Sequence, residues 1–274
     1  MLWSSSFVTA RVGLRLVSPL LFVGVRLVAA AALLGLAALV GRHSWAALRG
    51  RWHHLAVAGA LVNGVTLSAF HVGMVTENVA VMALLQSLGP TLIALSAVPP
   101  LGERLRSSQW LGLILGTVGV LMVVTPRALE GPAGWRAIAL GLSGVAGLAG
   151  GTIYFRRFCE GVPLLGATTV QVAAGALLTV ALALGLERMH AVWTAPAVTS
   201  VVWNVLAVSI GAMALYYYLL ARGTAGRVAA NFLVPGTVPV AAWALLGERL
   251  TPLAVLGFAI ASTGVFLVAR ASGP

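Results

Sequence analysis

Nine apolar segments, each about as long as a membrane-spanning helix, follow one another along this chain with short connections between them. They cover approximately residues 18–41, 54–74, 79–99, 109–125, 134–155, 163–186, 197–220, 226–246 and 251–269. A helix needs about 20 predominantly apolar residues to cross the hydrocarbon core of a bilayer. A shorter apolar segment, residues 1–16, precedes them and is interpreted as a truncated or short first helix. The sequence therefore predicts an all-α integral membrane protein with about ten transmembrane helices.

The low charge content makes the bilayer the main solvent for this chain. Only 8% of the residues are charged, whereas a soluble domain carries about 25%. Aspartate and lysine are absent, which excludes a P-loop and a lysine Schiff base. We therefore expect no enzyme activity, no ATP-driven pumping, no cofactor and no metal site. The net charge of +11 would suggest nucleic-acid binding in a soluble protein, but here the arginines lie between apolar segments and no nucleic-acid partner is expected.

The distribution of arginines predicts the orientation in the membrane. With ten spans that begin and end in the cytoplasm, ten arginines fall in inner loops and six in outer loops. Positive charge accumulates on the cytoplasmic side of membrane proteins. This favours a multi-pass inner-membrane protein with both termini in the cytoplasm.

An internal repeat relates the two halves of the chain by a constant offset of 145 residues. The offset maps Pro90 onto Pro235, and the segment Gly102-Glu103-Arg104-Leu105 onto Gly247-Glu248-Arg249-Leu250. The halves are assigned to residues 1–125 and 134–270. Each would hold five spans, and an odd number of crossings turns the second copy upside down. Two inverted five-helix repeats are typical of secondary transporters, which bind their cargo at the repeat interface.

Several motifs occur in a characteristic order along the chain. They are Trp3-Ser4-Ser5-Ser6-Phe7-Val8, then Ser18-Pro19 followed by Arg26, then Pro90 with Gly102-Glu103-Arg104-Leu105, and the repeat of that pair in the second half. The chain resembles the EamA-type branch of the drug/metabolite transporter superfamily over essentially its whole length. The resemblance implies a ten-helix bundle with a central cavity formed by spans one to four and six to nine. It also implies export of amino acids, metabolites or toxic compounds.

Arg26 is the charged residue placed deepest in an apolar segment, about 12 Å from its start by helical rise. An arginine at this depth must reach the interface, pair with an acid or bind something. Two interpretations stay open. Arg26 either fixes the helix position, or it pairs with Glu77 to gate the protein or orient an anionic cargo.

Polar and aromatic residues inside the spans are candidates for a substrate cavity, because such groups must face protein or water within a bilayer. Together with Arg26 the candidates are Asn63, His71, Gln86, Tyr154, Gln171, Asn204, Tyr216 and Asn231. Hydrogen bonding between helices is the alternative role of each one. Glu77, Pro90 and Pro235 are candidates for gating or hinge positions, since a proline inside a helix removes a backbone hydrogen bond.

Small residues spaced by four, Gly112 with Gly116 and Gly257 with Ala261, predict close helix packing. The surface formed by these small residues is compatible with either a monomer or a homodimer, so the oligomeric state stays open. The function favoured by these observations is secondary transport, with export of small organic solutes across the bilayer by alternating access. The alternatives are a membrane scaffold or sensor, or a lipid-handling membrane protein without transport.

Overall fold

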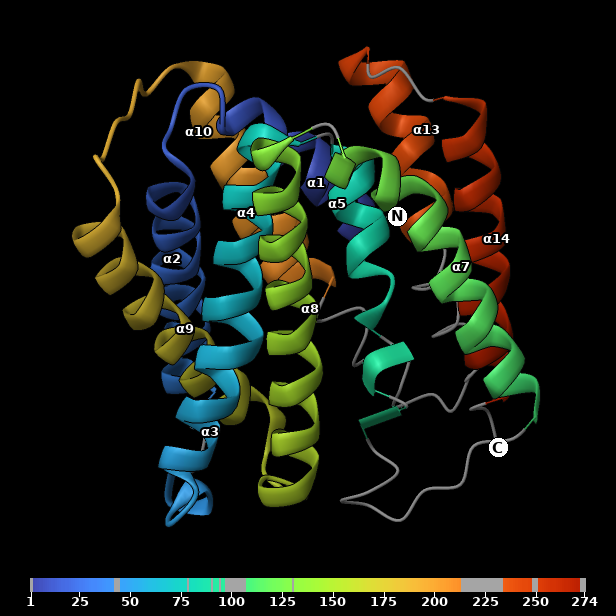
Figure 1. The fold of residues 1–274 in the computed structure, drawn as a ribbon. Helices are drawn as coiled ribbons and strands as arrows, with labels where there is room; N and C mark the ends of the chain where they lie inside the picture. The colour runs from blue at the N-terminus through green and yellow to red at the C-terminus, as the bar shows by residue number, and fades with distance from the viewer. Residues whose placement is uncertain are drawn as a thin grey trace.

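The computed structural model of the chain is a bundle of α-helices (Figure 1). It describes residues 2–41, 45–77, 79–89, 91–93, 95–96, 107–129, 131–212, 234–247 and 251–271. The long uninterrupted helices are α2 (Pro19–Val40), α7 (Ser107–Leu129), α8 (Pro132–Phe158), α9 (Leu164–Leu186) and α14 (Pro252–Ala271). The shorter ones are α1 (Leu2–Gly13), η1 (Trp45–Leu48), α5 (Val79–Gln86) and α13 (Val234–Leu246).

Two further helices contain a π-helical turn. One runs through α3 (Trp52–Gly59), η2 (Ala60–Val65) and α4 (Thr66–Thr76), and the other through α10 (Ala195–Trp203) and η3 (Asn204–Ala212). A π-helix bonds i to i+5 and is often found at functional sites. The only β pairing among the described residues is an isolated antiparallel bridge between Val17 and Ala191.

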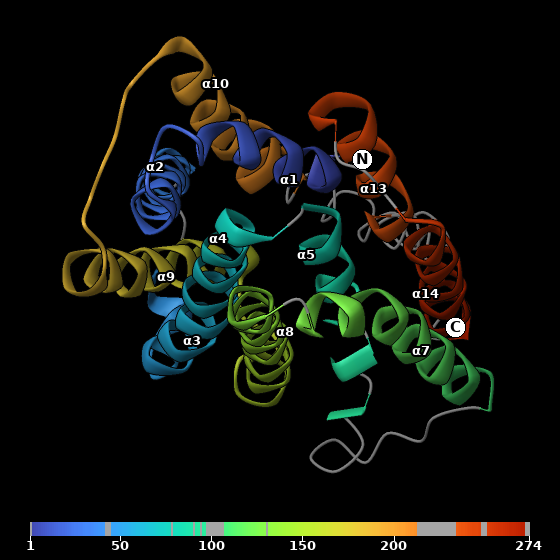
Figure 2. The same cartoon turned by 45° about the horizontal axis from the view of Figure 1, so that its top comes forward.

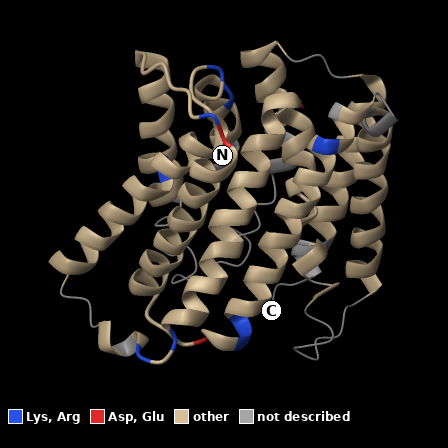
Figure 3. Ribbon diagram, turned by 60° about the vertical axis from the view of Figure 1, so that its left-hand side comes forward, with Lys and Arg blue, Asp and Glu red and all other residues tan. Residues whose placement is uncertain are grey.

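Length and surface chemistry identify a membrane protein. Five helical stretches are long and apolar enough to cross a bilayer: Pro19–Val40, Trp52–Thr76, Ser107–Pro126, Gly134–Phe158 and Leu164–Leu186. The prediction of apolar spanning helices is confirmed for these five. Large apolar side chains face outward, with Leu177 75% exposed, Leu184 68% and Trp243 62%. Most charged positions in the described part lie toward the two ends of the bundle (Figure 3).

The offset of 145 residues found in the sequence also relates the helices. It carries α2 onto residues 164–185 of α9, and residues 107–126 of α7 onto α14. It carries η2 onto residues 205–210, which lie within η3, and α1 onto residues 147–158 of α8. The two π-helical turns therefore occupy equivalent places in the two halves.

Two of these equivalent pairs, α2 with α9 and α7 with α14, pack against each other (Figure 2) and run antiparallel. At one end of the α2–α9 pair the backbone N–H groups of Leu20 and Leu21 meet the Glu187 carboxylate, and toward the other end Gly35 lies against Thr169. Residue numbers therefore rise along α2 while they fall along α9. In the α7–α14 pair Gly116 faces Gly264, and Gly119 faces Ala261 and Gly257. This pair is antiparallel as well.

Small residues bring the α7 and α14 backbones into direct contact, which confirms the predicted close packing. A Cβ atom added to Gly264 would lie 2.4 Å from the Gly116 nitrogen and 2.5 Å from the Gly112 oxygen. A Cβ added to Gly119 would lie 2.5 Å from the Ala261 nitrogen. Side-chain atoms do not occupy such distances, so glycine is required for this approach.

Candidate functional site

Arg26 lies in α2 with only 5% of its surface exposed. It is seven residues from the start of the helix at Pro19, or about 10 Å by helical rise. Its Nε donates a hydrogen bond to the Ser209 hydroxyl at 3.1 Å, and its Nη1 donates to the Ser6 hydroxyl at 3.4 Å. Both partners are neutral, so within the described residues the charge of Arg26 is held by hydroxyls and not by a carboxylate.

Asn204 connects these hydroxyls to the rest of the polar network. Its side chain is fully buried. Ser6 donates to its Oδ1 at 2.7 Å, and its Nδ2 donates to the Thr9 hydroxyl at 3.0 Å and to the Ser200 carbonyl at 3.0 Å. The Ser200 hydroxyl donates to the Thr9 carbonyl. The network therefore joins α1 and α2 of the first half to α10 and η3 of the second.

Local helix geometry places these residues on shared faces. Ser200 and Asn204 are four residues apart in an α-helix, and Ser209 follows five residues later across the π-helical turn of η3. Because a π-helix repeats at longer spacing than an α-helix, Ser209 stays on the side that carries Asn204. On α1, Ser6 and Thr9 are three residues apart and face the same neighbour.

His71 lies in α4 beside this network and is 4% exposed. Its Nδ1 is 2.7 Å from the Leu67 carbonyl oxygen, while its Nε2 is buried without a hydrogen-bond partner. The ring stacks on Phe22, with centroids 5.8 Å apart. Phe22 precedes Arg26 by one helical turn on the same face of α2.

The repeat-equivalent position has a different chemistry. The offset of 145 maps Arg26 onto Gln171, Asn204 onto Gly59 and Ser209 onto Gly64. A Cβ added to Gly59 would lie 2.2 Å from the Gln171 carbonyl oxygen, so the backbones touch there. Where α2 contacts η3, a buried charge thus lies among hydroxyls and an amide. Where α9 contacts α3 and η2, the equivalent helix contact is made by glycine and has no charge.

The remaining predicted residues fall into separate places. Asn63 in η2 contacts α9 near Gly175, close to the Gln171 segment. The Tyr154 hydroxyl is 2.8 Å from His54 Nδ1, at the end of α8. Gln86 is the last residue of α5 and is half-buried. The structure brings Arg26, Asn204 and His71 together, and it places Asn63, Gln171, Tyr154 and Gln86 elsewhere.

The predicted gate and hinge positions are only partly described. Glu77 is buried at the C-terminal end of α4, and Arg11 donates to the Met74 carbonyl near that end. Pro235 is the second residue of α13, which also contains Pro239. Pro90, Tyr216 and Asn231 lie outside the described residues. Pairing of Arg26 with Glu77 stays a prediction, and in this conformation Arg26 donates to Ser6 and Ser209.

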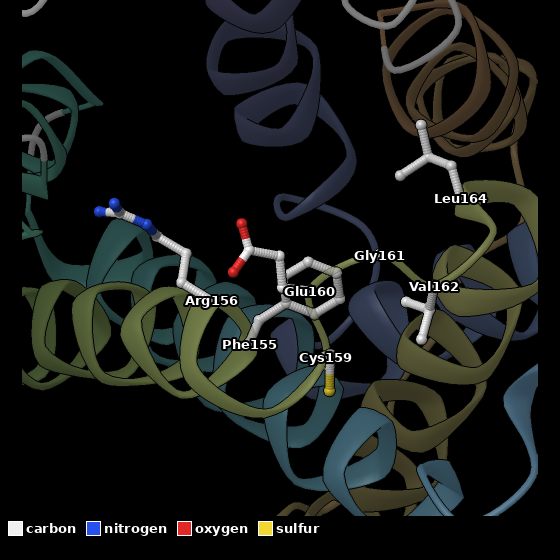
Figure 4. A pocket seen from close by; sticks show the side chains of 7 residues that line it. All are labelled: Phe155, Arg156, Cys159, Glu160, Gly161, Val162 and Leu164. Atoms are coloured by element: carbon white, nitrogen blue, oxygen red, sulfur yellow. The ribbon is translucent and has the colours of Figure 1, made fainter. Parts of the chain in front are cut away.

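A pocket of about 400 Å³ opens at the loop between α8 and α9 (Figure 4). Its lining residues are Phe155, Arg156, Cys159, Glu160, Gly161, Val162 and Leu164. The Cys159 side chain points away from the Glu160 carboxylate (Figure 4), and burial raises the pKa of its thiol. A second hollow of about 320 Å³ lies between α2 and α9 and is lined by apolar residues and glycine. Among the described residues, no group of three His, Cys, Asp or Glu side chains could hold a metal ion.

The sequence profile of the EamA-like transporter family matches the chain twice, over residues 1–125 and 135–270. The two matches together span most of the chain, one for each half of the repeat. The chain belongs to the EamA family of membrane transporters.

Bacterial relatives match most of the chain. The uncharacterized transporter YvbV of Bacillus subtilis (strain 168) is 26% identical over 270 residues, which are 97% of this chain and 88% of the relative. The uncharacterized inner membrane transporter YedA of Escherichia coli (strain K12) is 28% identical over 275 residues, 97% of this chain and 87% of YedA. A probable terminal-alkyne amino-acid exporter of Streptantibioticus cattleyicolor is 31% identical over 224 residues, 77% of this chain and 72% of that protein.

A solved structure titled "Crystal structure of protein" has the same fold. It aligns with a TM-score of 0.68 and 20% sequence identity, covering 97% of this chain and 93% of that chain. An EamA transporter fold thus holds the polar network at the contact between its two repeats.

The sequence of this EamA protein predicted Arg26 and Asn204, but it did not predict their partners Ser6, Thr9, Ser200 and Ser209. Hydroxyl residues in apolar helices commonly bond to their own backbone, so their presence alone indicates little. The spacing of Ser200 and Asn204 by four residues was a usable signal for a shared face. The five-residue step to Ser209 was not, because it depends on the π-helical turn.

Proposed function

We propose that this EamA transporter is a secondary transporter that exports small organic solutes from the cytoplasm by alternating access. In this proposal ten spans form two inverted five-helix halves in the inner membrane, with both termini in the cytoplasm. Energy comes from a solute or ion gradient, since the chain has no aspartate and no lysine for ATP-driven chemistry.

The antiparallel packing of equivalent helices supports an inverted repeat. Both the α2–α9 pair and the α7–α14 pair are related by the offset of 145 residues, and both run in opposite directions. Two similar halves in opposite orientations can exchange conformations at little cost in free energy, so outward-open and inward-open states have comparable stability. Alternating access needs this property.

The observation that carries the proposal is the buried Arg26 at the contact between the halves. Burial of an ionised group without a charged partner is expensive, and such residues in membrane proteins mark substrate or ion pathways. A guanidinium with spare N–H donors is well suited to bind an acidic group of a solute. The Streptantibioticus relative is described as a probable terminal-alkyne amino-acid exporter, and amino acids carry such a group.

In this proposal Arg26, His71 and Asn204 contact the substrate, and Tyr216 and Asn231, which lie outside the described residues, are further candidates for the same role. Asn63, Gln86, Tyr154 and Gln171 belong to the same proposal as residues that line the pathway in other conformations. Glu77, Pro90 and Pro235 would serve as gate and hinges. Substitution of either proline by alanine should then slow transport.

Transport in everted membrane vesicles tests the proposal. Vesicles with the wild-type protein should accumulate one or more members of a panel of amino acids, organic acids and toxic metabolites. Arg26→Gln at normal protein levels should reduce the rate about tenfold or more, because a charge-assisted hydrogen bond contributes about 1.5–3 kcal/mol. Absence of accumulation across the panel would contradict transport and favour the scaffold alternative.

A further inference from the structure

The unpartnered nitrogen of His71 has a defined hydrogen-bonding character. A carbonyl oxygen only accepts hydrogen bonds, so the 2.7 Å contact with the Leu67 carbonyl requires a proton on His71 Nδ1. In a neutral imidazole with its proton on Nδ1, the other nitrogen carries a lone pair and accepts. The buried Nε2 of His71 is therefore an acceptor that lacks a donor among the described residues.

Arg26, on α2, has the opposite hydrogen-bonding character. Among the described residues Arg26 donates to Ser209 and Ser6, which leaves further guanidinium N–H groups without a partner in that part of the chain. Phe22 relates the two residues, because it stacks on the His71 ring and precedes Arg26 by one turn of α2. Within the described structure, the site thus has unused N–H donors on the Arg26 guanidinium and an unpartnered acceptor, His71 Nε2, on a neighbouring helix.

The fold itself does not demand this charge. At the equivalent helix crossing in the other half, Gln171 takes the place of Arg26 and packs against Gly59 without a charge. The crossing can evidently close with neutral residues, and an unpartnered buried acceptor costs about 1–3 kcal/mol. A ligand that supplies an acidic group to Arg26 and a donor to His71 would satisfy both.

We propose that Arg26 and His71 together recognise small carboxylates that carry a hydrogen-bond donor on the adjacent carbon, as α-hydroxy and α-amino acids do. The carboxylate binds the Arg26 guanidinium, and the adjacent O–H or N–H donates to His71 Nε2. His71 is the residue that selects for the donor. This inference rests on the proposed function and assigns its substrate class.

Binding to the purified full-length protein in lipid nanodiscs tests the assignment without requiring transport. The probes are phenyllactate, phenylalanine, phenylpropionate and phenylalanine amide, with the leucine series as a second side-chain size. Phenyllactate and phenylalanine should bind about tenfold more tightly than phenylpropionate, which lacks the donor. Phenylalanine amide lacks the carboxylate and should bind weakly to the wild-type protein. All ligands should bind to Arg26→Gln about as weakly as the amide binds to the wild type.

Three variants separate recognition from folding. His71→Phe keeps an aromatic ring against Phe22 and should remove the preference for phenyllactate over phenylpropionate while leaving phenylpropionate binding unchanged. His71→Gln, which restores an acceptor, should recover part of the preference. Arg136→Gln removes an exposed arginine from α8 and should leave the whole pattern intact.

Equal binding of phenyllactate and phenylpropionate to the wild type would overturn the assignment, as would an equal loss for all ligands in His71→Phe, or no binding by any carboxylate. The proposed function can fail separately. If the binding pattern is found but vesicles accumulate none of the ligands, transport fails and the recognition site stands. If vesicles transport a solute whose rate is insensitive to His71→Phe and Arg26→Gln, transport stands and the site fails.

Discussion

At the residue scale, the central feature is a buried polar network whose members satisfy one another across the two halves. Asn204 is the hub, because it accepts from Ser6 and donates to Thr9 and to the Ser200 carbonyl. In a low-dielectric interior each of these bonds is stronger than in water, and each orphaned group is more costly. The network therefore holds α1 against α10 and η3 as well as holding Arg26 in place.

Asn204→Leu should destabilise the protein by about 2–4 kcal/mol, because it removes the acceptor of the Ser6 hydroxyl and a donor to the Thr9 hydroxyl and overfills a buried site. Thermal unfolding in detergent, followed by circular dichroism, measures the loss. Thr199→Val is the matched control, since Thr199 is exposed and bonds only to the backbone of its own helix. A stability change for Asn204→Leu no larger than that of the control would contradict the role of the network.

Cys159 offers a second test at this scale. It is the only cysteine, its side chain is buried, and burial raises the pKa of its thiol above the ordinary value. The thiolate is the reactive form, so alkylation by a maleimide should be slow near neutral pH and should accelerate as the pH rises toward the raised pKa. Mass spectrometry of the labelled protein measures the rate. Rapid labelling at neutral pH would show that the loop between α8 and α9 is more open than described.

The sequence was sufficient to place Arg26 deep in an apolar segment, because the length of that segment sets its depth, and to make His71 a candidate residue. It was insufficient for Ser209 and for the packing of His71 against α2. The side of η3 that faces α2 depends on a π-helical turn, which hydrophobic periodicity does not reveal, and the approach of His71 to α2 depends on packing between helices far apart in sequence.

At the scale of elements, the start of α2 is tied to the end of α9 by side-chain and backbone bonds. Glu187 accepts from the N–H groups of Leu20 and Leu21, and the backbone N–H of Ser18 donates to the His190 carbonyl at 2.8 Å. A carboxylate at a helix N-terminus accepts hydrogen bonds from otherwise unpaired N–H groups and interacts favourably with the positive end of the helix dipole. The offset maps Glu187 onto Arg42, so the equivalent position in the sequence of the first half carries an arginine and not a carboxylate.

Glu187→Ala should lower the free energy of unfolding by about 0.5–2 kcal/mol, the range found for lost N-caps. Thermal unfolding provides the measurement. Glu160→Gln alters an exposed carboxylate in another loop and should change stability by no more than about 0.5 kcal/mol. If both variants behave alike, the cap at α2 contributes nothing.

The α7–α14 contact makes a sharper prediction because it allows no side chain. Gly119→Ala should destabilise the protein by about 1–3 kcal/mol, since its Cβ would lie 2.5 Å from the backbone of α14. Gly150→Ala is the control, because a Cβ there meets nothing within 4 Å and alanine is the better helix former. Gly150→Ala should be neutral or stabilising under the same unfolding assay. A Gly119→Ala protein as stable as the wild type would mean that the two helices separate easily.

At the scale of the whole molecule, one offset of 145 residues accounts for the order of the helices, the two π-helical turns and the packing of equivalent helices. The repeat and the apolar segments were readable from sequence because duplication and hydrophobic length leave direct marks. The difference between the halves could not be predicted from the sequence. Arg26 contacts hydroxyl groups and Gln171 contacts a glycine, and these contacts depend on how the helices pack.

The most direct test of the account is whether repeat-equivalent positions face opposite sides of the membrane. Arg15 and Glu160 are both exposed and are related by the offset, so single cysteines at these two positions, introduced into a Cys159→Ser background, can be labelled in intact cells with a membrane-impermeant maleimide. Inverted halves predict that Arg15→Cys is labelled from outside and that Glu160→Cys is labelled only after the cells are permeabilised. Labelling of both positions from the same side would contradict the inverted repeat, and with it the alternating-access account.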